Sequence, residues 1–292
     1  YPKNSKDIKL LIQFAKNQKT SLIPRTAGTS LAGQCVGEGI VVDVSKYFTK
    51  IIELNLQDRT VRVQPGVNRD ALNAYLEPYN LFFGPNTPTS DYCMLGGMVG
   101  NNSSGTTSIR YGVTRDQVLE LETILSDGSP VLFKALSREE FIGKTKNPSL
   151  EGRIYNYFNQ TLSNGSVRKE IRDEVPEASV HRRNTGYALD ALIKQKPFDT
   201  NGSQFNLSKL LTGSEGTLAF TTSITLQLEP LPPQKAVILA LHFDSISNAM
   251  RAVVPVMHHK LFTCELIDKT ILDCTKDHPG YQQHRIFIKG DP

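Results

Sequence analysis

Residues 24–34 read Pro24-Arg25-Thr26-Ala27-Gly28-Thr29-Ser30-Leu31-Ala32-Gly33-Gln34, and they follow a short predicted strand over 21–24. Small side chains leave backbone N–H groups accessible, so such a loop can form an anion-binding nest that a diphosphate approaches closely. An ordinary glycine-rich turn has a similar composition, because short glycine motifs give many false matches. The loop has no G-K-[ST] ending, and no G-x-G-x-x-G run leads into a helix. It is therefore a candidate phosphate site that belongs to neither of those two classes.

A second glycine-rich segment covers residues 95–105. It reads Leu95-Gly96-Gly97-Met98-Val99-Gly100-Asn101-Asn102-Ser103-Ser104-Gly105. We predict a loop here. Ordering such a loop costs much conformational entropy unless a ligand or a neighbouring backbone supplies hydrogen bonds, which favours ligand binding. Just upstream, Phe83-Gly84-Pro85-Asn86-Thr87-Pro88 predicts a rigid turn that can pack against a flat ring system.

A third segment, Thr212-Gly213-Ser214-Glu215-Gly216-Thr217-Leu218, precedes a predicted strand over 219–228. Its glutamate can accept hydrogen bonds from ribose hydroxyls or an adenine amine. Taken by itself, the segment is better interpreted as a surface turn.

The pattern between these segments predicts mixed helices and strands. Helical spacing covers 5–16, and strands are expected at 40–44, 51–54 and 60–64. Asn68 is expected to cap a helix that Pro78 ends, and Asp127-Gly128 to turn a hairpin between 118–125 and 131–133. Helices follow through about residue 175.

The proline cluster at 229–233 predicts a boundary between a domain over 1–231 and the beginning of a second domain over 232–292. In the second domain we expect a strand at 237–243, a helix at 246–257 and a strand at 262–267. This is the start of an α+β unit that we expect the chain not to complete.

Composition limits the possible partners. The 292 residues carry a formal net charge of +4 without a clustered Lys/Arg run, so no nucleic-acid partner is expected. The four cysteines form no C-x-x-C pair, and adjacent His258 and His259 would diverge by about 100° on a helix, so no metal site is predicted. No apolar run reaches the ~18 residues of a membrane span and no secretory leader is visible, so we expect a cytoplasmic protein, with peripheral membrane association left open.

Taken in order, the three segments resemble the FAD-binding domain of the vanillyl-alcohol oxidase and p-cresol methylhydroxylase family, over residues 2–231. The chain looks most like the D-2-hydroxyacid dehydrogenase branch, which acts on D-lactate, glycolate or D-2-hydroxyglutarate. Arg183-Asn184-Thr185-Gly186-Tyr187, followed by Gly213-Ser214-Glu215-Gly216, supports that placement. Residues 182–190 and 265–268 are similar to large members that are fused to iron–sulfur modules. The implied fold is α+β: a p-cresol methylhydroxylase-type FAD-binding domain of two α+β subdomains, then the start of an α+β substrate (cap) domain.

The resemblance also implies roles for individual residues. The first loop would wrap the FAD diphosphate, through Pro24, Arg25, Thr26, Ala27, Gly28, Thr29, Ser30 and Gln34. The second segment would line the cofactor through Gly96, Gly97, Gly100, Asn101, Asn102, Ser103, Ser104 and Gly105. Pro85 and Thr89 would approach the isoalloxazine or ribityl region. Tyr111, Gly112, Asp116 and Val118 would lie at the adenosine end, and Glu215, Gly216 and Ile224 would complete the pocket.

The resemblance predicts non-covalent FAD. Relatives that attach the flavin through the first loop have a histidine there, whereas this chain has Thr29 after Gly28. Cys93 is the alternative point of attachment, although a small buried thiol is the better interpretation.

The flavin would accept a hydride equivalent from the carbon that bears the substrate hydroxyl, giving a 2-oxo acid. The partners expected are a small hydroxy acid and an electron acceptor, which would be an iron–sulfur module, a quinone or an electron-transfer protein. Arg183 and Tyr187 are candidates for the substrate side, and no catalytic base is predicted. Any iron–sulfur clusters and divalent metal would lie in regions absent from this chain.

Two other functions stay open. The first is a flavin oxidase or reductase of the same fold that acts on another alcohol, against which the segment 183–187 argues. The second is an FAD-binding fragment that is inactive without a completed substrate domain.

Overall fold

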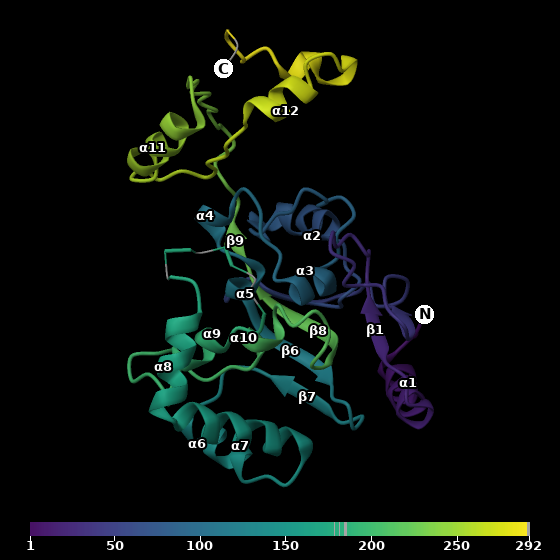
Figure 1. Ribbon diagram of the computed structural model, residues 1–292. Coiled ribbons are helices and arrows are strands. Elements are labelled where there is room, and N and C mark those ends of the chain that lie inside the picture. The colour runs from purple at the N-terminus through teal and green to yellow at the C-terminus, as the bar shows by residue number, and fades with distance from the viewer. Residues whose placement is uncertain (178, 181, 184–185, 291–292) are drawn as a thin grey trace.

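The computed structural model describes residues 1–177, 179–180, 182–183 and 186–290, which form a mixed α+β structure (Figure 1). Its main sheet has five strands in the order β3-β4-β8-β6-β7, and every neighbouring pair is antiparallel. The strands are β3 (Ile51–Asn55), β4 (Thr60–Val63), β8 (Phe220–Gln227), β6 (Val118–Ile124) and β7 (Pro130–Phe133). The last of these strands in the chain, β8, occupies the centre of the sheet.

Alternating side chains fix which face of the sheet is buried. Val61 and Val63 of β4 are fully buried and pair in register with Leu226 and Ile224 of β8. The strand predicted from this alternation is confirmed. One core then runs along the sheet, because Leu121 of β6 pairs with Ile224 from the other side.

The predicted hairpin between β6 and β7 is also confirmed. Gly128 has φ +85°, and the Leu125 N–H donates to Ser129 O at 2.9 Å. Asp127 accepts a hydrogen bond from the Ser129 N–H through its carboxylate at 2.9 Å. Only the glycine needs the left-handed backbone region here, and the aspartate stabilises the turn through its side chain.

A smaller parallel sheet lies at the N-terminal side of the molecule. Helix α1 (Ser5–Gln18) precedes β1 (Leu22–Arg25), which pairs in parallel with β2 (Ile40–Asp43). Parallel strands need a crossover connection, and here residues 26–39 make it as a loop without a helix. A second core cluster joins this sheet to the main one through Ile8, Val42, Phe48, Ile124 and Phe220. The first glycine-rich loop is therefore held at both ends by strands.

Short helices cover one end of the main sheet, and one of them contains most of the second glycine-rich segment. Asn68 caps the first of them, accepting a hydrogen bond from the Ala71 N–H at 2.9 Å, as predicted. Pro78 lies within a 3₁₀ turn that follows directly. The elements are α2 (Arg69–Leu76), η1 (Glu77–Tyr79), β5 (Leu81–Phe82), α3 (Leu95–Asn101), α4 (Ser108–Tyr111) and α5 (Thr114–Gln117).

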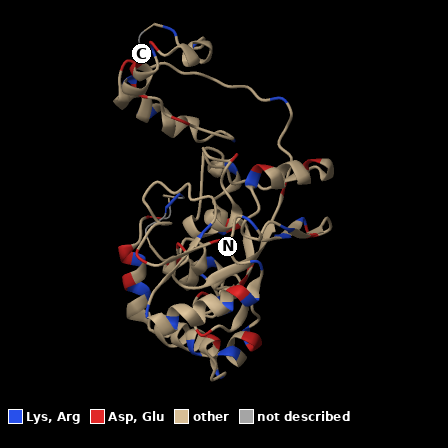
Figure 2. Ribbon diagram, turned by 90° about the vertical axis from the view of Figure 1, so that its right-hand side faces the viewer, with Lys and Arg blue, Asp and Glu red and all other residues tan. Residues whose placement is uncertain are grey.

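A helical layer packs beside β6 and β7, at the bottom of Figure 1. Its core is aromatic, because Phe133, Phe141, Tyr155 and Phe205 bury their rings against one another. Figure 2 shows basic and acidic residues interspersed along the outer helices. The elements are α6 (Arg138–Thr145), α7 (Leu150–Ser163), α8 (Gly165–Glu174), α9 (Leu189–Ile193) and α10 (Ser208–Leu211).

The segment 232–290 stands apart from the rest of the molecule in Figures 1 and 2. The predicted helix forms as α11 (Ile246–Val256), followed by α12 (Lys269–Cys274) and η2 (Pro279–His284). The strands predicted at 237–243 and 262–267 are wrong. No described strand runs alongside to take their backbone hydrogen bonds, and Val237 and Ile238 are each 94% exposed.

The main sheet ends just before the proline cluster. After Gln227 the chain leaves β8, and Glu229–Pro230 forms a two-residue strand, β9, that pairs with β5. Beyond it, Phe262 packs its ring against Tyr111 of α4, with 6.2 Å between centroids. Within the described residues, no helix is both long and apolar enough to span a membrane.

Candidate FAD site

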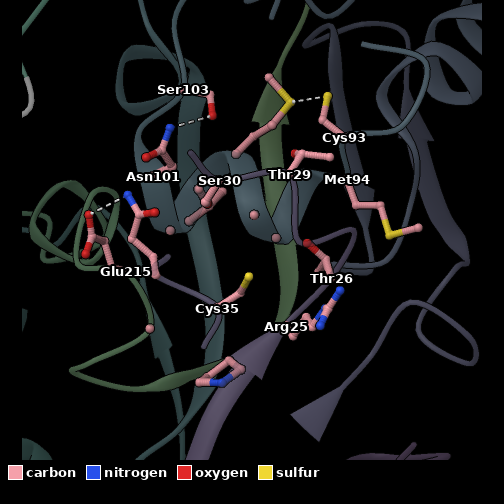
Figure 3. A pocket seen from close by; sticks show the side chains of 18 of the residues that line it. Arg25, Thr26, Thr29, Ser30, Cys35, Cys93, Met94, Asn101, Ser103 and Glu215 are labelled. Atoms are coloured by element: carbon pink, nitrogen blue, oxygen red, sulfur yellow. Dashed lines mark hydrogen bonds between the residues drawn. The ribbon is translucent and has the colours of Figure 1, made fainter. Parts of the chain in front are cut away.

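A cavity lies where the first loop, α3 and the turn after α10 meet. Its volume is about 440 Å³, within the ~300 to 1,000 Å³ that is usual for small-molecule and cofactor sites. Figure 3 shows Arg25, Thr29 and Ser30 from the first loop facing Asn101 and Ser103 at the end of α3. Glu215 lies beside α3, on the same side of the view as Asn101, so three segments far apart in the sequence line one cavity.

The first loop presents its backbone to the cavity. Between Thr26 and Cys35, no backbone N–H donates a hydrogen bond to another described residue. Gly28 has φ +70°, and a Cβ added there would lie 2.7 Å from Nη2 of Arg25, so the guanidinium folds closely over this glycine. Free amides beside a cation are the donor set that a diphosphate requires.

Two side-chain atoms at the cavity are buried without a hydrogen-bond partner in the described chain. They are Nε of Arg25 and Oε1 of Gln34, and both residues line the cavity. Buried polar atoms are nearly always paired, so an orphaned donor and an orphaned acceptor fit a polar ligand that satisfies them. The residues present therefore fit a dinucleotide cofactor.

The second glycine-rich segment differs from the prediction, because its first seven residues form helix α3 and only the remainder is a loop. A Cβ added at Gly96 would lie 2.5 Å from Cβ of Pro65, and one added at Gly97 would lie 2.8 Å from Oγ1 of Thr26. The glycines let the helix touch its neighbours and the first loop directly. Close packing and buried Leu95, Met98 and Val99 offset the weak helix propensity of glycine, which costs about 1 kcal/mol relative to alanine.

The turn 213–216 is bonded to α3. The Gly213 N–H donates to Val99 O and the Glu215 N–H to Gly100 O, both at 2.8 Å. Glu215 is itself in the left-handed region, with φ +54°, and its Oε1 lies 3.5 Å from Nε2 of Gln34. The turn thereby links α3 with the first loop across the cavity mouth.

The structure brings most of the predicted cofactor residues together. Those that line the cavity are Pro24, Arg25, Thr26, Gly28, Thr29, Ser30, Gln34, Thr89, Gly96, Gly97, Gly100, Asn101, Ser103, Ser104, Glu215 and Gly216. Those outside the lining are Ala27, Pro85, Asn102, Gly105, Tyr111, Gly112, Asp116, Val118 and Ile224.

Several of the outlying residues have a structural part. Val118 and Ile224 are fully buried in the main core, and Asn102 caps α3 in the left-handed conformation. Asp116 accepts the Val113 N–H at 2.9 Å, close beside Gly112 with φ +70°. Cofactor contact stays a prediction for this group.

The prediction missed other lining residues, among them Cys35, Val44, Pro65, Met94, Ser214 and Phe220. Cys35 and Ser214 each adjoin a predicted residue, so sequence proximity could have found them. Val44, Pro65 and Phe220 reach the cavity only through packing between strands, for which the sequence carries no local signal.

The buried thiol of Cys93 is poorly suited to attach a flavin. Burial raises the pKa of Cys93, and the hydrogen bond from Thr87, with 3.3 Å from Oγ1 to Sγ, opposes this only in part. Its sulfur also lies 3.7 Å from that of Met98 (Figure 3). A thiol that stays protonated at neutral pH is a weak nucleophile.

The two substrate-side candidates lie outside the cavity lining. Arg183 forms an ion pair with buried Asp190 and donates to Pro176 O at 3.3 Å. Tyr187 is half exposed, and its hydroxyl lies 2.8 Å from that of Thr217, next to the turn 213–216. Asn184 and Thr185 lie outside the described residues. Among the residues described, no group of three or more His, Cys, Asp or Glu side chains could hold a metal ion.

Two families match the chain. Residues 1–133 match the FAD binding domain, and residues 232–289 match the C-terminal domain of FAD linked oxidases. A D-2-hydroxyglutarate dehydrogenase of Pantoea ananatis (strain AJ13355) is 32% identical over 100% of this chain and 28% of its own length. The glycolate oxidase subunit GlcD of Bacillus subtilis (strain 168) is 25% identical over 95% of the chain and 46% of its own length.

A solved alkyldihydroxyacetonephosphate synthase superposes on 79% of the chain and 32% of its own, with a TM-score of 0.50 and 16% identity, which shows a shared fold. The chain therefore belongs to the FAD-linked oxidases and has their α+β FAD-binding fold. The relatives named above belong to the D-2-hydroxyacid branch that the sequence resembles. The chain spans less than a third of the D-2-hydroxyglutarate dehydrogenase it matches.

Proposed function

We propose that this chain binds FAD without a covalent bond in the 440 Å³ cavity and forms the flavin-binding part of a D-2-hydroxyacid dehydrogenase. The observation that carries the proposal is the pair of buried, unpartnered atoms, Nε of Arg25 and Oε1 of Gln34, beside a loop whose amides donate to no described acceptor.

The three segments have separate tasks in this site. The Arg25 guanidinium and the amides of 28–30 would hold the diphosphate, and α3 would lie along the cofactor with glycines where contact is closest. Glu215 would accept hydroxyl or amine donors. Bound FAD supplies the two-electron acceptor for oxidation of a hydroxyl-bearing carbon.

The substrate proposed is a D-2-hydroxy acid of the lactate, glycolate or 2-hydroxyglutarate class. Support comes from the activities for which the relatives are named and from the sequence of the segment 183–187. The electron acceptor proposed is an iron–sulfur module, a quinone or an electron-transfer protein.

One observation favours a narrower function for this chain taken alone, namely FAD binding without substrate oxidation. Within 232–290 no described hydrophobic side chain is buried, so a substrate pocket has no core to support it there. The chain would then bind FAD without oxidising substrate.

Acid precipitation tests the cofactor proposal. The purified chain should show the flavin absorption spectrum, and FAD should be released into the supernatant. Colour retained in the pellet would contradict non-covalent binding and direct attention to Cys93 and Cys35. A colourless chain that fails to take up added FAD would overturn the site.

A substrate panel tests the second part. Reduction of the flavin by D-2-hydroxyglutarate, D-lactate or glycolate, followed with an artificial dye as acceptor, would support the dehydrogenase. FAD binding without reduction by any of the three would support the narrower function.

A further inference from the structure

Two partly buried cations are not among the lining residues of the cavity and form no ion pair with a described carboxylate. They are Arg115 of α5 and Lys209 of α10. Charged side chains are rarely taken out of water without an opposite charge, so this placement needs a reason.

Each cation is bonded to the backbone of the other's element. Nε of Arg115 donates to Lys209 O at 2.9 Å, and Nζ of Lys209 donates to Arg115 O at 2.8 Å. Lys209 also donates to Val118 O at 2.7 Å. These reciprocal hydrogen bonds connect the segment 115–118 to α10.

Arg115 is also hydrogen-bonded next to two segments that line the cavity, α3 and the turn 213–216. Nη2 of Arg115 donates to Thr212 O at 2.7 Å, immediately before the turn that carries Glu215. The backbone N–H of Arg115 donates to Oδ1 of Asn102 at 2.8 Å, at the C-terminal end of α3. One residue thus contacts the end of the glycine-rich helix and the start of the turn.

The pKa shifts of the two cations are consistent with their partial burial. Burial lowers the pKa of Lys209 to about 8, with the nearby Arg115 lowering it further and Asp116 raising it. Burial also lowers the pKa of Arg115, and Arg183 acts in the same direction. The folded chain therefore holds both cations at a cost in free energy, which the carbonyl contacts offset.

We propose that Arg115 and Lys209 are positioning residues, which set the distance between α3 and the turn 213–216 and so shape the cavity for FAD. This inference rests on the proposed FAD site. Neither side chain needs to touch the cofactor, because each acts through Asn102, Thr212 or the segment 115–118.

The test uses the full chain and measures the Kd for FAD and the visible circular dichroism of the bound flavin. Lys209→Met keeps the length of the side chain and removes its donors, and Lys209→Arg restores a charged donor. We expect Lys209→Met to weaken FAD binding at least tenfold and to change the flavin spectrum. Lys209→Arg should bring the Kd back to within about threefold of the original value.

The matched control is Lys235→Met, the same exchange at an exposed lysine, which should leave Kd and spectrum unchanged. If Lys209→Met does not fold, Arg115→Lys decides the question. It retains the charge, but one ammonium group cannot reproduce the guanidinium's contacts to both Lys209 O and Thr212 O, so it should also weaken FAD binding.

A merely structural role gives a different result: the folded variants would lose thermal stability while Kd and flavin spectrum stay the same, and that result overturns the inference alone. If the unmodified chain and Lys235→Met both fail to bind FAD, the proposed site fails and the inference fails with it.

Discussion

Residues 232–290 are no less apolar in composition than residues 1–231, but their side chains are far more exposed. The first region buries a continuous cluster from Val61 to Leu228, whereas in the second region Val237 and Ile238 are almost fully exposed. The second region matches a family domain even so. Sequence similarity and an apolar strand pattern are therefore insufficient to form a sheet, because a strand also needs neighbours for its backbone groups.

The largest expected effect distinguishes the two regions. Ile224→Ala removes a fully buried side chain between β4 and β6, and should lower the free energy of unfolding by about 3 kcal/mol, measured with urea. Val254→Ala, at a residue of α11 that is 66% exposed, should change it by less than about 0.5 kcal/mol. Equal losses in the two variants would show that the second region has a core of its own.

The pH dependence of the free energy of unfolding tests the buried Lys209 of the first region. Burial lowers the pKa of Lys209 to about 8, below its ordinary value of 10.5, so the unfolded chain holds more protons between these values and stability rises with pH across that window. Relative to Lys209→Met, the original chain should gain about 3 kcal/mol from pH 7 to pH 10.5. Parallel unfolding curves for the two proteins at every pH would contradict this.

Glycine-to-alanine substitutions compare a tightly packed site, Gly96, with an open one, Gly143. Gly96→Ala places a methyl group 2.5 Å from Cβ of Pro65, so α3 must move, and FAD affinity should fall about tenfold in a fluorescence titration. Gly143→Ala in α6 meets nothing within 4 Å and should stabilise the helix by about 0.5 to 1 kcal/mol without affecting FAD. Wild-type affinity in Gly96→Ala would mean that α3 tolerates the shift.

The smallest effect concerns the contact between the regions. Phe262→Ala removes the ring that packs on Tyr111 and under the Arg110 guanidinium, and should change the free energy of unfolding by less than about 0.5 kcal/mol. Limited proteolysis should cleave 232–290 faster, while the Kd for FAD stays constant. A loss of FAD binding would show that the second region supports the cavity.

Local signals predicted much of the first region. Alternation at Val61 and Val63 found β4, and Asn68 and Gly128 marked a cap and a turn where the structure has them. Helix α3 was not predicted because three glycines disfavour a helix, and the close approach of Pro65 and Thr26, which explains two of them, has no local sequence signal. Of the site, the loop residues were found by motif, whereas Val44 and Phe220 depend on strand packing.

The central place of β8 in the main sheet has a consequence for the order of folding. β4 and β6 do not pair with each other, and the pairs β3-β4 and β6-β7 are joined into one sheet only by residues 220–227 of β8. During synthesis the first 133 residues, although they match one family domain, hold the sheet's outer pairs without the strand that joins them. Closing contacts of such long sequence separation is slow, so we expect the nascent chain to acquire cooperative structure late, after β8 has left the ribosome.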